Sequence, residues 1–298
     1  MRVLVTGRDG QLARSLAKRG ADVAGLALER MGRPELDLER PESIAAAIAA
    51  AAPDVVVNAA AYTAVDQAED EPERAFRING AAAGEVASAA RRAGARIIQV
   101  STDYVFDGTG EGAYAETAPT RPLGAYGRSK LDGELRVSES NPDHVVLRTA
   151  WVYGANGRNF VKTMLGAAVQ RDELDVVADQ RGSPTASDDL ADGILALICA
   201  WRERPRLGLG RRYHLAGTGE ASWFDFASAI FEEAARHGLP AATVRPIHSA
   251  DWPTRAPRPA NSVLDSSRFE ADFGYRSPHW RQSMAAVVAD LARRGREG

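Results

Sequence analysis

The stretch "VLVTGRDGQLARSL", residues 3–16, joins an aliphatic strand to an amphipathic helix through two glycines. Gly7 and Gly10 permit a tight turn and let the backbone N–H groups at the start of the helix approach a pyrophosphate. Ala13 takes the third small position of this pattern, where it allows close packing of the helix on the strand. Glycine turns between strands and helices are common, but this one opens a series of alternating strands and helices. That place in the chain predicts a dinucleotide site.

The same alternation continues through the first 154 residues. Short runs rich in Val and Ile are near-continuously apolar, which is typical of parallel strands buried on both faces. Repeated strand–helix–strand units predict an α/β fold of the Rossmann type, with a doubly wound parallel sheet. The expected strands are 2–6, 54–60, 96–102 and 144–154, and the expected helices are 10–19, 42–51, 73–93 and one around Tyr126.

After Gly154 the alternation loosens, and the Pro-rich stretch 251–262 cannot form a regular element. Further helices are expected over 159–171, 187–203, 223–237 and 279–294. We therefore predict an NAD(P)-binding Rossmann domain and a smaller C-terminal α+β lobe that binds substrate. The first covers 1–150, with 187–216 returning to it, and the second covers 151–186 and 217–298.

The composition excludes several classes of protein. The chain has 298 residues and a formal net charge of −3, which argues against nucleic-acid and membrane partners, because both need concentrated positive charge. No apolar run approaches the roughly 18 residues of a membrane span, and the strand at the N-terminus leaves no room for a signal peptide. Cys199 is the only cysteine, so we expect no disulfide and a cytoplasmic location. The five histidines are scattered without ligand spacing, so zinc is not expected.

Two further stretches carry candidate catalytic groups. "VSTDYVFDG", residues 100–108, ends a central strand, and that edge of an α/β sheet is where ligands bind. "AYGRSKLDGE", residues 125–134, places Tyr126 and Lys130 one helical turn apart on the same face. We expect Tyr126 to give its phenolic proton to a carbonyl oxygen, with Lys130 lowering the pKa of the phenol and binding the nicotinamide ribose. Thr102 would align the carbonyl oxygen through a hydrogen bond.

The Tyr-x-x-x-Lys spacing also arises by chance and carries little weight alone. Its combination with the glycine turn and a hydroxyl at a strand end favours carbonyl reduction with a nicotinamide cofactor. Three consecutive alanines could lie against that flat cofactor, or could simply allow tight packing of a helix on a strand. They are Ala59, Ala60 and Ala61.

The choice between NADPH and NADH depends on the end of the second strand, expected near 23–29. An acidic residue there would bind the adenosine ribose, but Ala27 takes that place and Glu29 follows two positions on. Three arginines could instead bind a 2′-phosphate, which would favour NADPH, or could simply be exposed. They are Arg8, Arg30 and Arg33.

Several blocks together resemble the dTDP-4-dehydrorhamnose reductase family of the extended short-chain dehydrogenase/reductase superfamily. They include "GRDGQLARSL", "PDVVVNAAAYTAVDQAE", "STDYVFDG", "YGRSKLDGE" and "DQRGSPT". The similarity runs from Met1 to about Trp280. The resemblance implies NAD(P)H-dependent reduction of the 4-keto group of dTDP-4-dehydro-β-L-rhamnose to dTDP-L-rhamnose.

The resemblance also implies roles for particular residues. Implied contacts of the cofactor are Gln11, Leu12, Asp37, Leu38, Ala61, Tyr62, Thr63, Tyr126 and Lys130, to which the motifs above add Gly7, Arg8, Gly10, Ala59 and Ala60. Implied contacts of the nucleotide sugar are Thr102, Asp103 and Trp151, and Tyr104 at the same strand end joins them as a candidate. Arg258, in "RPANS", could bind the pyrophosphate of the substrate bidentately, or could cap a helix at the surface.

Some members of that family form dimers around a magnesium ion held by carboxylates, one of them from the first helix. Here the first helix, "QLARSLAKR", contains no acid. Acids at the start of a later helix are explained by the helix dipole alone; they are Asp188, Asp189 and Asp192. We therefore predict no metal site and leave a homodimer open.

Two other functions stay open. The chain could be a reductase or epimerase of a different nucleotide sugar, because the sequence does not reveal the shape of the nucleobase pocket. It could also be a non-catalytic NADP-binding regulatory subunit, similar to the β subunit of methionine adenosyltransferase. The full set of Thr102, Tyr126 and Lys130 argues against that second alternative.

Overall fold

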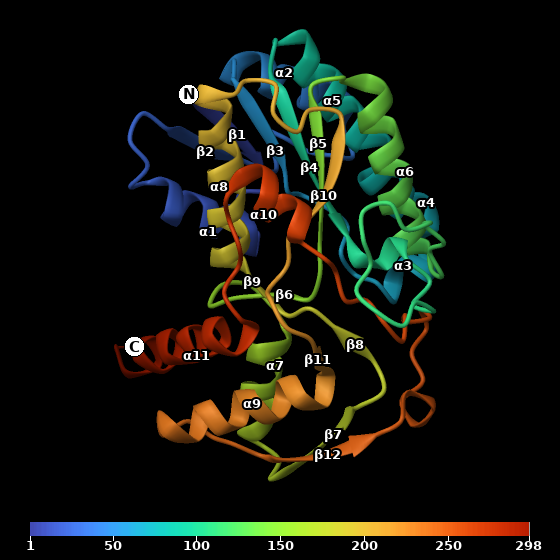
Figure 1. The fold of residues 1–298 in the computed structure, drawn as a ribbon, viewed down its shortest axis with the longest axis vertical. Coiled ribbons are helices and arrows are strands. Elements are labelled where there is room, and N and C mark those ends of the chain that lie inside the picture. The colour runs from blue at the N-terminus through green and yellow to red at the C-terminus, as the bar shows by residue number, and fades with distance from the viewer. Residues whose placement is uncertain (298) are drawn as a thin grey trace.

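The computed structural model describes the backbone of residues 1–297 and the side chains of residues 1–295. Residue 298, the last of the expected substrate lobe, lies outside the described residues. A central sheet with flanking helices forms the upper half of Figure 1, and a smaller group of helices and short strands forms the lower half. The predicted α/β class, with a parallel sheet and a smaller α+β part, is confirmed.

The central sheet has six strands, all parallel, in the order β10-β5-β4-β3-β1-β2. Their bounds are β1 (Arg2–Thr6), β2 (Ala27–Met31), β3 (Val55–Asn58), β4 (Arg96–Thr102), β5 (His144–Thr149) and β10 (Arg211–His214). The strand order reverses between β1 and β3. Ligands of such sheets bind beyond the carboxyl ends of the strands at that reversal.

The strand expected over 144–154 is interrupted at Trp151. The φ angle of Trp151 is 46°, in the left-handed region that residues with a bulky side chain rarely adopt. The chain turns there, and β6 (Val152–Tyr153) leaves the central sheet to pair with β9 (Thr185–Ala186). The expectation of one continuous strand was wrong, because nothing in the aliphatic run signals the turn.

Helices cover both faces of the sheet. Successive residues of β1 point to opposite faces, so that Val3 and Val5 pack in one apolar cluster and Leu4 in another. The first cluster is covered by α1 (Gln11–Gly20), α8 (Ser187–Glu203) and α10 (Ser267–Phe273). The second is covered by α2 (Pro41–Ala51), α5 (Ala82–Arg92) and α6 (Ala125–Ser140). Burial on both faces explains why the strands are aliphatic at every position rather than alternately.

The single helix expected over 73–93 has three parts: α4 (Pro72–Phe76), a π-helical turn at Arg77–Ala81, and α5. The buried Asn79 of the π-helical turn accepts a hydrogen bond from the Tyr62 N–H (2.8 Å) and donates to the Tyr62 carbonyl (3.0 Å). Its amide also donates to the Ser129 hydroxyl on α6 (3.0 Å). Asn79 therefore fixes the chain after β3 to the helix that carries Tyr126.

The lower half of the molecule packs α7 (Phe160–Ala168), α9 (Trp223–Arg236) and α11 (Trp280–Glu297) around a core that includes Phe226, Ile230 and Trp280. Two strand pairs complete it. One is parallel, β7 (Glu173–Val177) with β12 (Thr243–Ile247), and the other antiparallel, β8 (Arg181–Gly182) with β11 (Ala221–Ser222). These short strands were not expected from the sequence.

The Pro-rich stretch crosses from the lower half to the upper half. Beyond the 3₁₀ turn Ser249–Asp251, it contains no helix up to Ser262. Arg255 forms an ion pair with Asp70 at the end of α3 (Gln67–Asp70), and the Ala256 N–H donates to the Asp66 carboxylate (3.1 Å).

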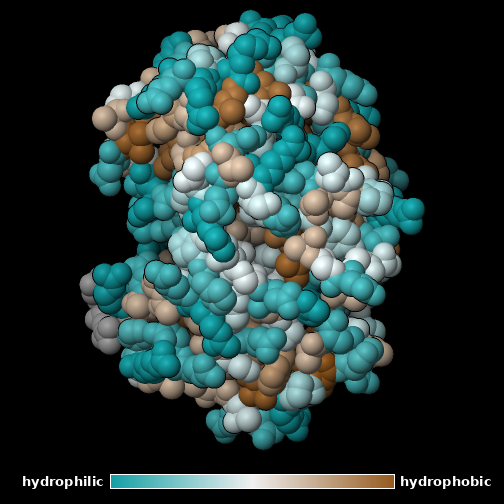
Figure 2. Space-filling model, viewed as in Figure 1, coloured by the Kyte–Doolittle hydropathy of each residue, from teal (hydrophilic) through white to brown (hydrophobic). Residues whose placement is uncertain are grey.

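The face drawn in Figure 2 is largely hydrophilic, with its apolar residues scattered. None of the described helices combines the length and the apolar character that crossing a bilayer requires.

The packing of α6 generates a stability prediction. A methyl group on Gly133 would come within 2.0 Å of the Asn79 carbonyl oxygen, so Gly133→Ala should lower the free energy of unfolding by about 1–3 kcal/mol, the usual effect of overpacking. Gly166→Ala in α7 is the matched control, because no described atom lies within 4 Å of its added methyl group. That control should raise stability by up to about 1 kcal/mol. Urea unfolding measures both variants, and equal changes would contradict the close approach of α6.

Candidate active site

A cleft of about 1050 Å³ opens at the carboxyl edge of the sheet. Its walls are the turn after β1, the chain after β3, the ends of β4 and β5, and the start of α6. Trp223, at the start of α9, contributes a wall from the lower half of the molecule. The structure brings every predicted site residue except Arg30 and Arg258 to this cleft.

The glycine turn forms one end of the cleft. Gly7 has a φ angle of 94°, and its N–H donates to the Met31 carbonyl oxygen at 2.7 Å. Gly10 precedes α1, and among the described side chains none caps this helix or places an acid in its first turn. The N–H groups at the start of a helix carry a partial positive charge. The turn is thus open to an anion on its cleft side, with Gln11 and Leu12 lining it.

The end of the second strand differs from the expectation. Strand β2 spans Ala27–Met31, so Glu29 lies within it, beside Leu4 in the register with β1. Gly32 and Arg33 follow the strand instead, and both line the cleft. The expectation placed the strand too early, because "ALERM" contains no β-branched residue to mark it.

Basic groups surround this end of the cleft. The Arg30 guanidinium donates to the Arg8 carbonyl oxygen at 2.8 Å, and Arg8 forms an ion pair with Glu35. Arg33 faces the cleft as well. Asp37 and Leu38, two of the predicted contacts of the cofactor, line the adjoining wall.

Tyr126 and Lys130 lie at the other end, on the first turns of α6. The Ala125 N–H at the start of that helix donates to the Glu69 carboxylate at 2.6 Å. Tyr126 is half-buried and its ring meets the Tyr104 ring edge to face, with centroids 5.7 Å apart. Lys130 is 4% exposed, and its ammonium donates to the Val100 carbonyl oxygen at 2.6 Å.

The electrostatics of this pair correct one expectation. Burial raises the pKa of Tyr126 well above its ordinary value, and a hydrogen bond with Thr102 only partly opposes this. Burial lowers the pKa of Lys130 to about 8, against the opposing charge of Glu134. The expected lowering of the phenol pKa by Lys130 is not found, because desolvation dominates and the ammonium donates to the Val100 carbonyl oxygen instead.

Thr102 and Asp103 follow at the end of β4. The Thr102 hydroxyl donates to Asp103 Oδ1 at 2.9 Å. Asp103 is 2% exposed, and its Oδ2 has no hydrogen-bond partner among the described residues. Burial raises the pKa of the Asp103 carboxyl to about 6, and the nearby hydroxyls of Ser262 and Thr102 partly oppose this. Asp103 therefore retains one unused polar atom beside the cleft.

Trp151 and Trp223 form a stacked pair that lines the cleft. Their ring centroids lie 3.4 Å apart with an interplanar angle of 3°. A face-to-face arrangement of two aromatic rings is less favourable than an offset one, so the surrounding packing holds it. The sequence analysis named Trp151 and missed Trp223. The only local signal for Trp223 is its place directly after Ser222, the N-cap of α9.

Arg158 was also missed. It lines the cleft from the loop between Gly154 and Asn159, opposite the glycine turn. The Asn159 amide donates to the Gln11 side-chain carbonyl at 3.0 Å, which ties this loop to the turn. The contact spans 148 positions of sequence, so local patterns carry no signal for it.

Arg258 pairs with Asp66 rather than lining the cleft. Its Nη2 donates to Asp66 Oδ2 at 2.8 Å, while its Nη1 is buried without a partner among the described residues. Asp66 directly precedes α3. The predicted contact of Arg258 with a pyrophosphate stays a prediction.

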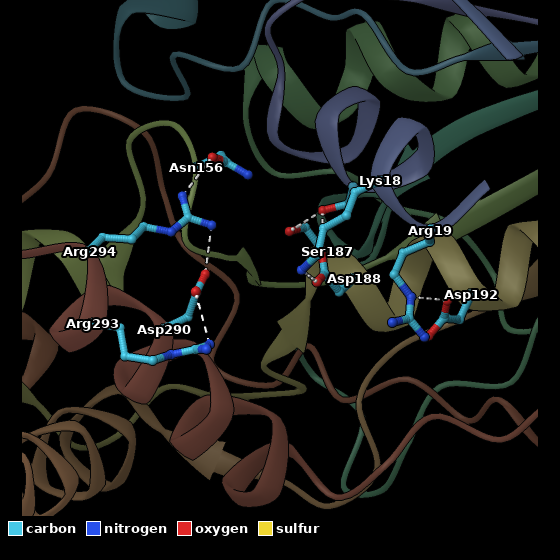
Figure 3. A network of polar contacts seen from close by, with 10 residues as sticks. Lys18, Arg19, Asn156, Ser187, Asp188, Asp192, Asp290, Arg293 and Arg294 are labelled. Atoms are coloured by element: carbon cyan, nitrogen blue, oxygen red, sulfur yellow. Dashed lines mark hydrogen bonds and ion pairs between the residues drawn. The ribbon is translucent and has the colours of Figure 1, made fainter. Parts of the chain in front are cut away.

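Two acids of α8 are paired with cations of α1 (Figure 3). Asp188 accepts from the Lys18 ammonium (2.8 Å) and from the Ser15 hydroxyl (2.6 Å). Asp192 accepts two hydrogen bonds from the Arg19 guanidinium, at 2.6 and 2.7 Å. These ion pairs, rather than the helix dipole alone, account for Asp188 and Asp192, while Asp189 accepts a hydrogen bond from the Ser283 hydroxyl. In the part of the chain that the structure describes, no group of three or more His, Cys, Asp or Glu side chains could hold a metal ion.

Comparisons with known proteins agree along the whole chain. A family model described as "RmlD substrate binding domain" matches residues 1–293. The dTDP-4-dehydrorhamnose reductase of Sinorhizobium fredii is 44% identical, with 100% of both chains covered. The crystal structure of a dTDP-4-dehydrorhamnose reductase from Clostridium acetobutylicum is 36% identical with a TM-score of 0.90, and the match covers 98% of this chain and 99% of that one. The enzyme of Bacillus anthracis, solved in complex with NADP, is 34% identical with a TM-score of 0.89, covering 97% and 99%.

Asp103 generates a prediction about stability and pH. A carboxyl whose pKa is higher in the folded state makes the fold less stable as pH rises from the unfolded pKa through the folded one. Asp103→Asn removes that penalty, so its stability relative to the parent should grow between about pH 4 and pH 7, by up to about 3 kcal/mol. Hydrogen bonds from Thr109 lower the pKa of Asp107, so Asp107→Asn should show no such gain. Urea unfolding at a series of pH values measures this, and a pH-independent difference for Asp103→Asn would contradict it.

Proposed function

The chain belongs to the family described as the RmlD substrate binding domain, and from that premise we propose that it reduces the 4-keto group of dTDP-4-dehydro-β-L-rhamnose with NADPH or NADH. The product is dTDP-L-rhamnose. One observation carries the proposal. A phenol, an ammonium and a hydroxyl meet at one end of a cleft whose other end is an open glycine turn; they belong to Tyr126, Lys130 and Thr102.

The cleft fits a nicotinamide dinucleotide. Gly7 brings the backbone close, since a side chain there would contact Ala60 at 3.4 Å, and the uncapped start of α1 suits a pyrophosphate. Asp37 and Leu38 would flank the adenine, and Ala59 to Ala61 with Tyr62 and Thr63 would lie along the cofactor. When bound, the dinucleotide supplies the two electrons and the hydrogen that reduce the carbonyl carbon.

Tyr126 would supply the proton to the carbonyl oxygen. Its raised pKa keeps the phenol protonated at neutral pH, so a proton is available for each turnover. The same raised pKa makes the phenolate left behind costly, and the Lys130 ammonium, one helical turn along the same face, would offset that cost by turning from the Val100 carbonyl toward the phenolate. Thr102 would donate a hydrogen bond to the same carbonyl oxygen, which aligns it for protonation.

The nucleotide sugar would lie between the end of β4 and the stacked indoles. Trp151 and Trp223 offer a flat apolar wall with N–H donors at its edge. Asp103, with its unused Oδ2, and Tyr104 would accept or donate hydrogen bonds to sugar hydroxyls. Arg258 is the candidate for the substrate pyrophosphate.

The two halves of the molecule would bind different ligands. We propose that residues 1–150, with 187–216, bind the dinucleotide and that the remainder binds the nucleotide sugar. The one cysteine, Cys199, is free, which suits a reducing compartment, so we propose a cytoplasmic location. The homodimer suggested by the family resemblance is likewise a proposal, and light scattering on the purified chain measures it.

Replacing Tyr126 tests the activity. Tyr126→Phe should lower kcat by at least about 100-fold, the usual contribution of a general acid, and leave the dissociation constant of NADPH within about twofold, since the ring is kept. Tyr275→Phe is the matched control outside the cleft and should retain activity. Assays use NADPH and the dTDP-, UDP- and GDP-linked 4-keto sugars. Preference for a base other than thymine would point to another nucleotide sugar, and a chain that binds NADPH without turnover would be a regulatory subunit.

Replacing Arg33 tests the choice of cofactor. If Arg33 contacts a 2′-phosphate, Arg33→Ala should raise the KM for NADPH by about tenfold, the usual effect of losing one charged hydrogen bond, and leave the KM for NADH nearly unchanged. Arg171→Ala, on an exposed loop away from the cleft, is the control. Equal increases for both cofactors would remove Arg33 from the 2′-phosphate site.

A further inference from the structure

We propose that Glu134 is a positioning residue for the reduction, because its buried carboxylate keeps Lys130 in the ammonium form and fixes α6 against β4 and β5. The inference rests on the proposed function, since it concerns the ammonium that would stabilise the Tyr126 phenolate. Glu134 follows Lys130 by one helical turn, so Tyr126, Lys130 and Glu134 lie along one face of α6.

The carboxylate of Glu134 is fully buried and uses both of its oxygens. Oε1 accepts from the Ser101 hydroxyl at 2.6 Å and from Arg148 Nε at 2.8 Å. Oε2 accepts from Arg148 Nη2 at 2.7 Å. Glu134 therefore joins α6 to the carboxyl ends of β4 and β5. Its partner on β4, Ser101, directly precedes Thr102.

The arrangement fixes α6 along β4 as well as against it. Lys130 donates to the Val100 carbonyl oxygen, and Glu134 accepts from Ser101, the next residue of the strand. Thr102 follows. Two contacts to successive residues set both the position and the rotation of the helix relative to the strand end. Tyr126 and Thr102 are thereby held at the same end of the cleft.

The buried Glu134–Arg148 ion pair is not well explained as a contribution to the stability of the fold alone. Arg148 is 2% exposed, and its guanidinium lies over the Phe106 ring, 5.1 Å from the centroid. Burying two charges costs several kcal/mol per ion, and apolar replacements of such pairs are often equally stable. A buried pair beside the candidate catalytic groups is therefore better explained by what its charge does to its neighbours.

Several titratable groups lie on α6 and on the elements packed against it. They are Tyr126 and Glu134 on α6, Asp103 and Tyr104 after β4, Arg148 on β5, and Arg212 on β10, whose Nε lies 3.6 Å from Glu134 Oε2. Among them Glu134 raises the pKa of Lys130, while burial lowers it to about 8. Without the carboxylate, burial acts unopposed and the amine loses its charge at a lower pH.

The test measures Lys130 directly. The chain has three lysines, Lys18, Lys130 and Lys162, so a ¹³Cε-lysine NMR titration gives three resonances, and the Lys130 signal is the one missing from Lys130→Arg. Glu134→Gln keeps the size of the side chain and removes its charge. Its Lys130 midpoint should fall by about one pH unit, and the alkaline limb of kcat/KM should move with it.

Three comparisons make the result decisive. Ser101→Ala removes a hydrogen bond without a charge and should leave the Lys130 midpoint in place, as should Lys18 and Lys162 in every variant. If Glu134→Gln does not fold, Glu134→Gln with Arg148→Gln removes both members of the buried pair and should still show a fall, smaller than in the single variant because the Arg148 cation is lost as well. An unchanged Lys130 midpoint in the folded single or double variant overturns the inference. A parent chain that reduces no 4-keto nucleotide sugar overturns the proposed function instead, and the NMR result stands apart from it.

Discussion

The close approach of α6 to its neighbours is the constraint on which the candidate site depends. A methyl group on Gly127 would lie 2.2 Å from the Tyr104 carbonyl oxygen, and one on Gly133 would lie 2.0 Å from the Asn79 carbonyl oxygen. The helix can rest directly on the end of β4 and on the π-helical turn only because these two positions have no side chain. That contact brings Tyr126 beside Thr102, and it buries Lys130 deeply enough for its charge to depend on a neighbour.

The glycine turn and α6 occupy opposite ends of one cleft because of strand order. The reversal between β1 and β3 opens a gap above the carboxyl edge, and α6 crosses to the same edge from β4. The lower half of the molecule then supplies the third wall through Trp223. Each wall comes from a different part of the chain, so a flat cofactor and a second ligand can be enclosed without a deep pocket in any one element.

The sequence predicted the features that are local. The central strands follow from near-continuous aliphatic runs, and the pairing of Tyr126 with Lys130 follows from helical spacing. Most of the predictions that were wrong concern features that depend on distant contacts. The left-handed turn at Trp151 is held by an indole 72 positions away, since Trp151 and Trp223 stack. The pKa of Tyr126 is set by the elements that bury it, and the partners of Asp188 and Arg258 come from α1 and from the residue before α3. The predicted position of β2 was wrong for a local reason, because that strand is half-exposed and lacks a run of aliphatic residues.

The five residues Asp66 to Asp70 connect two regions that otherwise lie apart. Asp66 and Asp70 bind the Pro-rich stretch through Arg258 and Arg255, while Glu69 accepts from the first N–H of α6. Dissolved counterions compete for exposed ion pairs of this kind over roughly 10 Å at 0.1 M ionic strength. Salt concentration thus acts on the anchorage of the Pro-rich stretch, chiefly through the exposed Arg255–Asp70 pair, whereas the part-buried hydrogen bond that Glu69 accepts at the start of α6 is screened far less.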